Sequence, residues 1–394
     1  MSAELSPGNA SNKVLEWSSS NPEVATITAE GQILPVSPGV TNITATTTDG
    51  TEITSNACEV TITPPQSRQE NQKLNLDPAS TPRINIEDYL AWPQNVGEGV
   101  VALWNDNKTG AYSITCDDGI SVDYDLWNAF TDTYGFNFTF FVPTGDTQMT
   151  EELKIIAKGN EIQSHTKSHY SDVKMATLTS AQKIDEFAQP FEIINTLPDS
   201  KCKTLAFSYG TGDLNYSRLY YIAGRGVSGF PNQANTVEYN RIGSKSMNGS
   251  VPVYYKGSDN TMEGNVKTLY DKDYLVTNKS YYGGWTNLHC HSLTTPLANP
   301  DMGGSKTTWD VLNHTFENYL KPAENVIWID TMTKIAMYGQ ERDTSQLTIT
   351  SNDENAIKYT LTDQMDDTMF DFPLTIKIKV DSNWNGISAT QNGI

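Results

Sequence analysis

Residues 111–119 read AYSITCDDG, a short apolar run that ends in two adjacent carboxylates and a glycine. The apolar run is typical of a buried strand, and Gly119 lets the backbone turn sharply at its end. Asp117 and Asp118 repel each other, so a strand end that serves stability alone rarely carries both. A metal ion would relieve the repulsion by binding one carboxylate and leaving the other free to act as a base.

Candidate strands and helices alternate on both sides of this stretch, from about residue 95 to residue 342. The expected strands cover 111–116, 136–142, 161–165, 204–209, 226–230, 286–291 and 326–330. The expected helices lie between them, at 122–134, 149–158, 180–197, 215–223, 262–276 and 307–320. This spacing predicts an α/β fold with a parallel sheet, either doubly wound or closed as a barrel. In both arrangements, active residues gather at the carboxyl ends of the strands.

Composition restricts the class of protein and its partners. A chain of 394 residues is expected to form two or three domains, and 37% hydrophobic residues suffice for a sizeable core. The formal net charge of −20 argues against nucleic acid and anionic membranes as partners, because binding phosphate requires clustered Lys and Arg. No apolar run is long enough for a membrane span, and the first residues are no export leader. An exported protein would need a leader outside these residues, and the oligomeric state stays open.

Two β-rich regions flank the α/β pattern. Residues 1–64 are rich in Ser, Thr, Asn and Val, with short alternating strands at 23–28 and 40–47, which predicts an all-β sandwich. The polar, proline-bearing residues 65–95 are expected to be a linker. Residues 343–394 return to alternating strands and predict a small accessory β-rich domain, whose completeness stays open.

Histidines follow two further expected strands. His165 and His169 lie in EIQSHTKSH, residues 161–169, and converge on one point if the chain turns helical there. Taken singly, each histidine is better explained by packing or a surface position, but this spacing at a strand end favours a metal site with one added carboxylate. In TNLHCHSL, residues 286–293, His289 and His291 alternate onto one face of a strand. One could act as a general acid, and we expect the other, His289, to be a buried core histidine.

Taken in order, these segments resemble the motifs of polysaccharide deacetylases, which form carbohydrate esterase family 4 and share the NodB homology domain. The matching segments are TCDDG at 115–119, HTKSH at 165–169, AFSYG at 206–210, His291, and the closing VIWIDT at 326–331. The resemblance covers roughly residues 100–342 and implies a distorted (β/α)7 barrel, with a catalytic domain over 96–342. Separately, WSSSNPEVA at 17–25 and GVTNITA at 39–45 resemble a bacterial group 2 immunoglobulin-like domain, which we expect to be truncated within residues 1–64.

The deacetylase resemblance implies a metal site and a base. Asp118, His165 and His169 match the ligands of one divalent metal ion, usually zinc and sometimes cobalt or nickel. Asp117 matches the general base that activates the attacking water. The metal lowers the pKa of water and polarises the acetyl carbonyl, so the two neighbouring carboxylates take separate roles.

The remaining roles are less regular. Tyr209 matches the tyrosine whose backbone N–H stabilises the oxyanion, and His291 matches the general acid. The family usually has a leucine two residues before this acid, where this chain has His289, so an exchange of the two histidines stays open. The third motif usually carries an arginine beside the base and has none here. Arg225, just before the strand expected at 226–230, could reach across to supply it, although a structural salt bridge is equally plausible. Asp330 could orient His291 or cap a helix.

Five aromatic residues are candidates for stacking on sugar rings: Tyr124, Trp127, Tyr209, Trp285 and Trp309. Core packing explains Trp127 better, whereas Trp285 beside two glycines is the better candidate for a cleft wall. The sequence thus predicts a secreted, periplasmic or cell-surface enzyme that removes N- or O-acetyl groups from a polysaccharide and releases acetate. The alternative is a catalytically silent carbohydrate-binding or adhesion protein on the same barrel.

Overall fold

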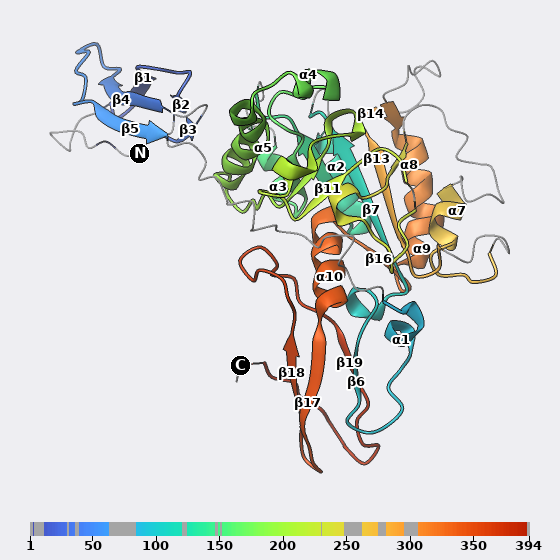
Figure 1. Cartoon of the computed structure of the whole chain (residues 1–394). Helices are drawn as coiled ribbons and strands as arrows, with labels where there is room; N and C mark the ends of the chain where they lie inside the picture. Colours follow the sequence, from blue (N-terminus) through green and yellow to red (C-terminus); the bar gives the residue numbers. More distant parts are fainter. Residues whose placement is uncertain are drawn as a thin grey trace.

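A computed structural model describes most of the chain, including the whole region of the predicted site (Figure 1). The described residues are 3, 12–29, 31–35, 39–62, 84–119, 124–145, 149, 152–229, 231–247, 262–274, 281–294 and 306–391. Among them, no helix is both long and apolar enough to cross a membrane.

A parallel sheet forms the centre of the molecule. Its strands follow the order β11-β10-β9-β8-β7-β13-β12, and β16 pairs with the first residues of β7. Their bounds are β7 Gly110–Asp117, β8 Thr139–Val142, β9 Glu161–Ser164, β10 Thr204–Ala206, β11 Ala223–Arg225, β12 Lys245–Ser246, β13 Trp285–Cys290 and β16 Ile327–Ile329. Every residue of β7 is buried, as its apolar run predicts, and all described pairings of this sheet are parallel.

The segment 242–246 closes this sheet into a distorted barrel. Ile242 exchanges backbone hydrogen bonds with Gly224 and Gly226 at β11, and the next residues, β12, pair with β13. Seven strands are therefore linked in a ring, with β16 outside it. The predicted (β/α)7 barrel is confirmed.

The strand expected at 226–230 lies at a different place. β11 covers residues 223–225, and the described residues 226–229 are not in a strand. Gly224 fits there because a Cβ at this position would lie 2.6 Å from the Phe207 ring. This earlier register places Arg225 within the sheet, directly beside Ala206 of β10.

Helices surround the barrel on its outer side (Figure 1). They are α2 Tyr124–Tyr134, α3 Leu153–Ile156, α4 Asp172–Ala176, α5 Ser180–Asn195, α6 Leu214–Ser217, α7 Met262–Lys267, α8 Trp309–Thr315, α9 Lys321–Ala323 and α10 Met332–Thr344. Short turns of helix are η1 Asn105–Asn107, η2 Ser208–Gly210 and η3 Tyr239–Arg241, and a π-helix, η5 Phe316–Leu320, extends α8. Of the expected helices, α5 matches closely, whereas α3 and α6 are much shorter. α7 is also much shorter than expected, because it ends at Lys267 and the described residues 268–274 are not helical, while residues 275–276 lie outside the described residues.

The C-terminal residues share a core with the barrel. α10 covers the amino ends of the strands, where the Met332 N–H donates to Thr139 Oγ1 over 2.8 Å. Met369 and Phe370 belong to the same buried cluster as Trp328 of β16. Beyond α10, β17 Gln346–Asn352 and β18 Ile357–Thr362 form a hairpin, and β19 Ile376–Ile378 pairs with β6 Gly99–Val101. The expected boundary between residues 342 and 343 therefore crosses one continuous core.

The N-terminal region is β-rich, as predicted. β1 Leu15–Ser19, β4 Gly39–Thr47 and β5 Cys58–Ile62 form an antiparallel sheet, and β2 Ala25–Ile27 pairs with β3 Ile33–Pro35. Part of the expected linker is structured, because α1 covers Ile86–Leu90 and Ile84 is buried in the core with Trp328. The other strands near the site are β14 Ser292–Thr294 and β15 Lys306–Thr308.

Replacing Glu341 with glutamine is expected to stabilise the protein at pH 8. Glu341 is 7% exposed, and its Oε2 has no hydrogen-bond partner in the part of the chain described. Burial, together with nearby Asp363, raises the pKa of this carboxyl to about 8. The folded state thus holds the proton more tightly, and the free energy of unfolding falls as pH rises from the ordinary carboxyl pKa toward 8. E341Q should raise that free energy on the order of 1 kcal/mol at pH 8 and far less at pH 5, measured by denaturant unfolding.

Candidate metal and catalytic site

Asp118, His165 and His169 converge at the carboxyl ends of β7 and β9. The Nε2 atoms of both histidines lie 3.3 Å from Asp118 Oδ1. The predicted convergence is confirmed, but the predicted helical turn is wrong. Thr166 and His169 instead have φ values of 64° and 49°, and this left-handed backbone folds the loop back on itself.

The local geometry of these three side chains is suited to binding a cation. Asp118 Oδ1 is buried and accepts no hydrogen bond from any described residue, which leaves a carboxylate oxygen without a donor. His165 Nδ1 lies 2.8 Å from the Ala206 carbonyl oxygen and donates to it, so its Nε2 keeps a lone pair facing Asp118. One ligand atom from each residue lies within 4.8 Å of the others, and the three could hold a metal ion.

Asp117 turns to the opposite side and contacts Arg225. The two side chains are almost completely buried, and Arg225 Nη2 donates to both carboxylate oxygens of Asp117. Burial alone would raise the pKa of Asp117, but the charge and hydrogen bonds of the Arg225 guanidinium, together with the nearby histidines, lower that pKa to about 2. The arginine that the third motif lacks therefore comes from the adjacent strand, at the position in register with Ala206. Asp118, at φ 73°, allows the two neighbouring carboxylates to diverge.

His289 and His291 occupy different environments on the face of β13. His291 is 34% exposed at its side chain, with Nε2 at 4.0 Å from Asp118 Oδ2. His289 is 3% exposed and its Nδ1 lies 2.8 Å from Ser244 Oγ. Burial and the nearby Arg225 lower the pKa of His289 to about 3, so it is neutral at ordinary pH. This contrast agrees with His291 at the open site and His289 in the core.

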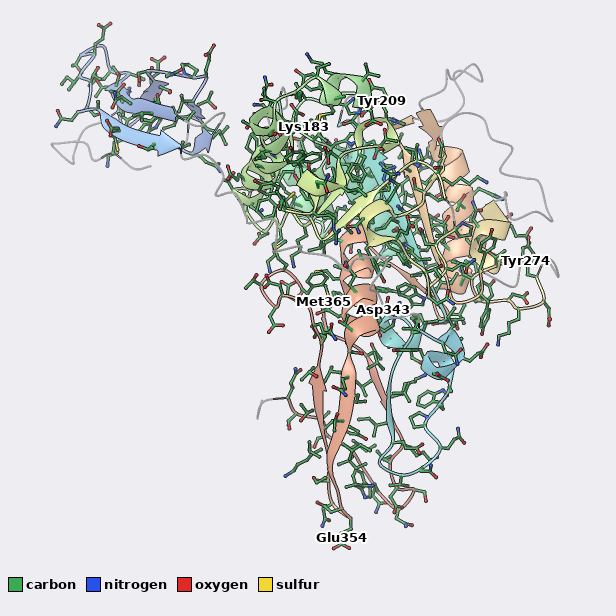
Figure 2. All side chains as sticks on the ribbon, in the orientation of Figure 1. Lys183, Tyr209, Tyr274, Asp343, Glu354 and Met365 are labelled. Atoms are coloured by element: carbon green, nitrogen blue, oxygen red, sulfur yellow. The ribbon has the colours of Figure 1, made fainter. Side chains whose placement is uncertain are left out.

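Tyr209 lies at the open end of the barrel, opposite Asp343 near the end of α10 (Figure 2). Its backbone is left-handed at φ 56°, and its ring is 65% exposed with its centroid 4.9 Å from that of the metal-site candidate His169. The structure therefore brings Tyr209 to the same edge as the three candidate ligands.

Asp330 does not lie beside His291, contrary to expectation. Its carboxylate accepts hydrogen bonds from Lys334 Nζ at 2.9 Å and Trp328 Nε1 at 3.3 Å. β16 pairs only with residues 110–112 of β7, so its end lies well below the carboxyl end of that strand. The helix that follows has Thr331 as its N-cap, so Asp330 is not the cap either. Asp330 forms an ion pair at the start of α10.

Most of the aromatic candidates are packed inside the fold. Trp285 is fully buried and its Nε1 donates to Ser113 Oγ over 2.9 Å, so its expected role as a cleft wall is wrong. It begins β13 and therefore lies at the end of the barrel away from the site. Trp127 is a core residue, as predicted. Tyr124 is buried, Trp309 stacks on Phe130 at 4.0 Å, and Tyr209 remains the exposed candidate.

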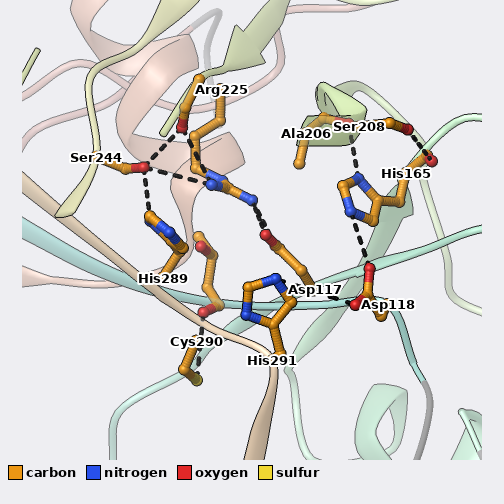
Figure 3. A network of polar contacts seen from close by, with 12 residues as sticks. Asp117, Asp118, His165, Ala206, Ser208, Arg225, Ser244, His289, Cys290 and His291 are labelled. Carbon is orange, nitrogen blue, oxygen red and sulfur yellow. Dashed lines mark hydrogen bonds and ion pairs between the residues drawn. The ribbon is translucent and has the colours of Figure 1, made fainter. Parts of the chain in front are cut away.

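Sequence reasoning missed Ser244, which contacts both Arg225 and His289. Ser244 precedes a strand of only two residues, and neither periodicity nor a motif marks it. Figure 3 shows the resulting chain of contacts from Asp117 through Arg225 and Ser244 to His289.

Comparison with protein families assigns two parts of the chain. Residues 1–57 match the family described as bacterial Ig-like domain (group 2), and residues 105–225 match the family described as polysaccharide deacetylase. A gellan lyase of Bacillus sp is 38% identical over 330 residues, which are 82% of this chain and 13% of that protein. An uncharacterized protein of Clostridium acetobutylicum is 41% identical over 63 residues, 16% of this chain and 6% of that protein. The chain thus spans only a small part of both relatives.

Solved structures with a similar arrangement include three carbohydrate deacetylases or esterases. A peptidoglycan N-acetylglucosamine deacetylase is 16% identical, with a TM-score of 0.36, covering 64% of this chain and 94% of its own. A peptidoglycan deacetylase of Bacillus subtilis is 16% identical, with a TM-score of 0.34 and coverage of 59% and 92%. A family 4 carbohydrate esterase of Streptomyces lividans is 14% identical, with a TM-score of 0.34 and coverage of 56% and 92%. From the family matches, the chain carries a group 2 bacterial Ig-like domain at residues 1–57 and a polysaccharide deacetylase domain that matches over residues 105–225.

Proposed function

We propose that this chain is a metal-dependent deacetylase that hydrolyses N- or O-acetyl groups of a polysaccharide and releases acetate. The observation that carries the proposal is that two neighbouring carboxylates at the end of β7 have separate partners. Asp118 faces two histidine Nε2 atoms, while the adjacent Asp117 is held by a buried arginine. A site that only binds sugar has no need for this division between two neighbouring carboxylates.

In this proposal, Asp118, His165 and His169 hold one divalent ion, zinc in the first instance with cobalt or nickel as alternatives. When bound, the ion supplies positive charge that lowers the pKa of water and polarises the acetyl carbonyl. Asp117, ionised because its pKa is about 2, accepts the proton of the attacking water. The Tyr209 backbone N–H donates to the oxygen that gains negative charge. His291 donates a proton to the leaving amine or alkoxide.

The alternative of a silent binding protein rested on the β-rich regions on both sides of the barrel and on the missing arginine of the third motif. Arg225 contacts Asp117 from β11, and this supports an enzyme with a paired base. We further propose an extracellular location and an acetylated polysaccharide as the partner, because Ig-like and deacetylase domains suit that setting. The name of the matched gellan lyase places gellan among the glycans to be tested.

Removal of the metal is expected to abolish acetate release. Protein purified without chelator should contain close to one divalent ion per chain by elemental analysis, and H165A or H169A should lose it. Acetate release would be measured on acetylated xylan, chitooligosaccharides, peptidoglycan and acylated gellan, before and after chelation and zinc return. H314A is the matched control, because His314 lies on α8 and contacts Asn318 instead of the site. Full activity in metal-free protein would refute the proposed mechanism.

A further inference from the structure

Ser244 and His289 continue the contacts of Arg225 away from the reacting groups (Figure 3). Arg225 Nη1 donates to the Gly226 carbonyl oxygen at 3.1 Å and to Ser244 Oγ at 3.3 Å, while Nη2 holds Asp117. The side chains of Arg225, Ser244 and His289 are all at least nine-tenths buried. Water therefore offers them few substitute partners, and each hydrogen bond within the group affects the orientation of the next.

The Ser244 hydroxyl determines the direction of these hydrogen bonds. A serine hydroxyl has one hydrogen to donate and two lone pairs to accept. Ser244 Oγ lies 2.6 Å from the Gly226 carbonyl oxygen, which can only accept, so the single hydrogen points there. Its contacts with Arg225 Nη1 and His289 Nδ1 must then be accepted hydrogen bonds. His289 therefore carries its proton on Nδ1.

Ser244 is the side-chain anchor that keeps the guanidinium in place. Arg225 Nε is buried and has no hydrogen-bond partner among the described residues. The guanidinium carbon lies 5.3 Å from the centre of the Phe141 ring, a contact that leaves rotation in the plane unrestricted. Without Ser244, the Gly226 carbonyl would be the one remaining partner of Nη1 among the described residues. His289 fixes Ser244 in turn, because its N–H occupies a lone pair of the hydroxyl.

We propose that Ser244 and His289 are positioning residues that hold Arg225 in the orientation in which it contacts both carboxylate oxygens of Asp117. This inference rests on the proposed deacetylase function, and it assigns His289 a task at the position where the family usually has a leucine. A leucine cannot donate to Ser244. Arg225 reaches Asp117 from β11, and the additional hydrogen bond from β13 restrains this displaced arginine.

Kinetics of four single variants and one double variant test the inference on the best substrate of the acetate panel. S244A and H289L should each lower kcat about tenfold, with KM and bound metal unchanged, as expected for one lost hydrogen bond. H289N retains an N–H close to the Nδ1 position and should keep most of the wild-type kcat, whereas H289Q places its amide near Nε2 and should not. The double variant S244A/H289L should be no slower than the slower single variant, because both act through one network. A wild-type kcat in S244A would overturn the inference, and so would equal losses in H289N and H289Q.

A measurement independent of turnover separates this inference from the proposed function. Ring ¹⁵N chemical shifts of the metal-free wild-type protein should show His289 neutral with its proton on Nδ1. A proton on Nε2 would overturn the hydrogen-bond directions, and with them the positioning role. If the wild type releases no acetate from any glycan while His289 shows the Nδ1–H form, the proposed function fails and the network stands. If H289L does not fold, S244A and the ring shifts still decide the outcome.

Discussion

Replacing Asp117 with asparagine is expected to lower kcat for acetate release by about 10²- to 10⁴-fold, the usual contribution of a general base. Asparagine has nearly the same shape as aspartate, but its amide cannot accept the proton of the attacking water. The candidate metal ligands Asp118, His165 and His169 are not altered. D117N should therefore retain the metal found in the wild-type protein, and KM should change much less than kcat. Steady-state kinetics and elemental analysis of the same preparation measure both.

D118N is the matched control for this prediction, because it removes the adjacent carboxylate instead. Asp118 Oδ1 faces both histidines, so D118N should lose the bound metal as well as activity. The two variants thus separate the base from the ligand although the residues are neighbours in the chain. The assignment would be reversed if D117N lost the metal and D118N kept it.

The barrel could be predicted because its strands carry local signals. β7 is mainly apolar, is buried throughout and ends at Asp117, so its burial and its carboxyl end follow from the pattern alone. The Asp118, His165 and His169 cluster also follows, because the carboxyl ends of parallel strands meet at one edge. The backbone conformation between the two histidines could not be predicted. Thr166 and His169 are left-handed, and a sequence usually indicates this conformation by glycine.

Errors arose where a position depends on the length or pairing of a strand. Asp330 directly follows a strand, but β16 is short and pairs only with the start of β7, so the end of β16 lies far from the site. Trp285 begins β13, and its neighbouring glycines indicated a loop at the cleft instead of a buried strand start. The β6–β19 pairing joins residues far apart in the sequence, and alternation in either strand cannot name its partner.

Arg225 could be named as a candidate from the sequence, but its contact with Asp117 could not be predicted with certainty. The family usually has this arginine in the third motif, whereas Arg225 lies later in the chain. The expected strand, moreover, began one residue after Arg225. Only the register of β10 with β11 shows that Arg225 takes the place beside Ala206. The roles of Ser244 and His289 then follow, because Ser244 contacts the displaced arginine and His289 contacts Ser244.

Replacing Arg225 with methionine is expected to shift the acidic limb of the kcat/KM profile to higher pH. Burial raises the pKa of Asp117, and the guanidinium is the largest of the groups that lower it, so its removal should move this pKa upward. The base would then be protonated over a range in which the wild type is ionised. Stability should change as well, because an unpaired buried carboxylate costs about 3–5 kcal/mol. Kinetics from pH 4 to 9 and thermal unfolding over the same range measure both effects.

The sign of the stability change with pH distinguishes loss of the ion pair from a general packing defect. In the wild type, the folded-state pKa of Asp117 is depressed, so the pair contributes stability above the ordinary aspartate pKa and loses it as pH falls toward 2. In R225M the folded-state pKa is raised instead, so the protein should lose stability, relative to the wild type, as pH increases. The double variant D117N/R225M has no carboxylate to leave unpaired and should recover much of the lost stability, with no such pH dependence. A deficit in R225M that is equal at all pH values, and equal in the double variant, would show that Arg225 acts by packing against Phe141 and not through the charge of Asp117.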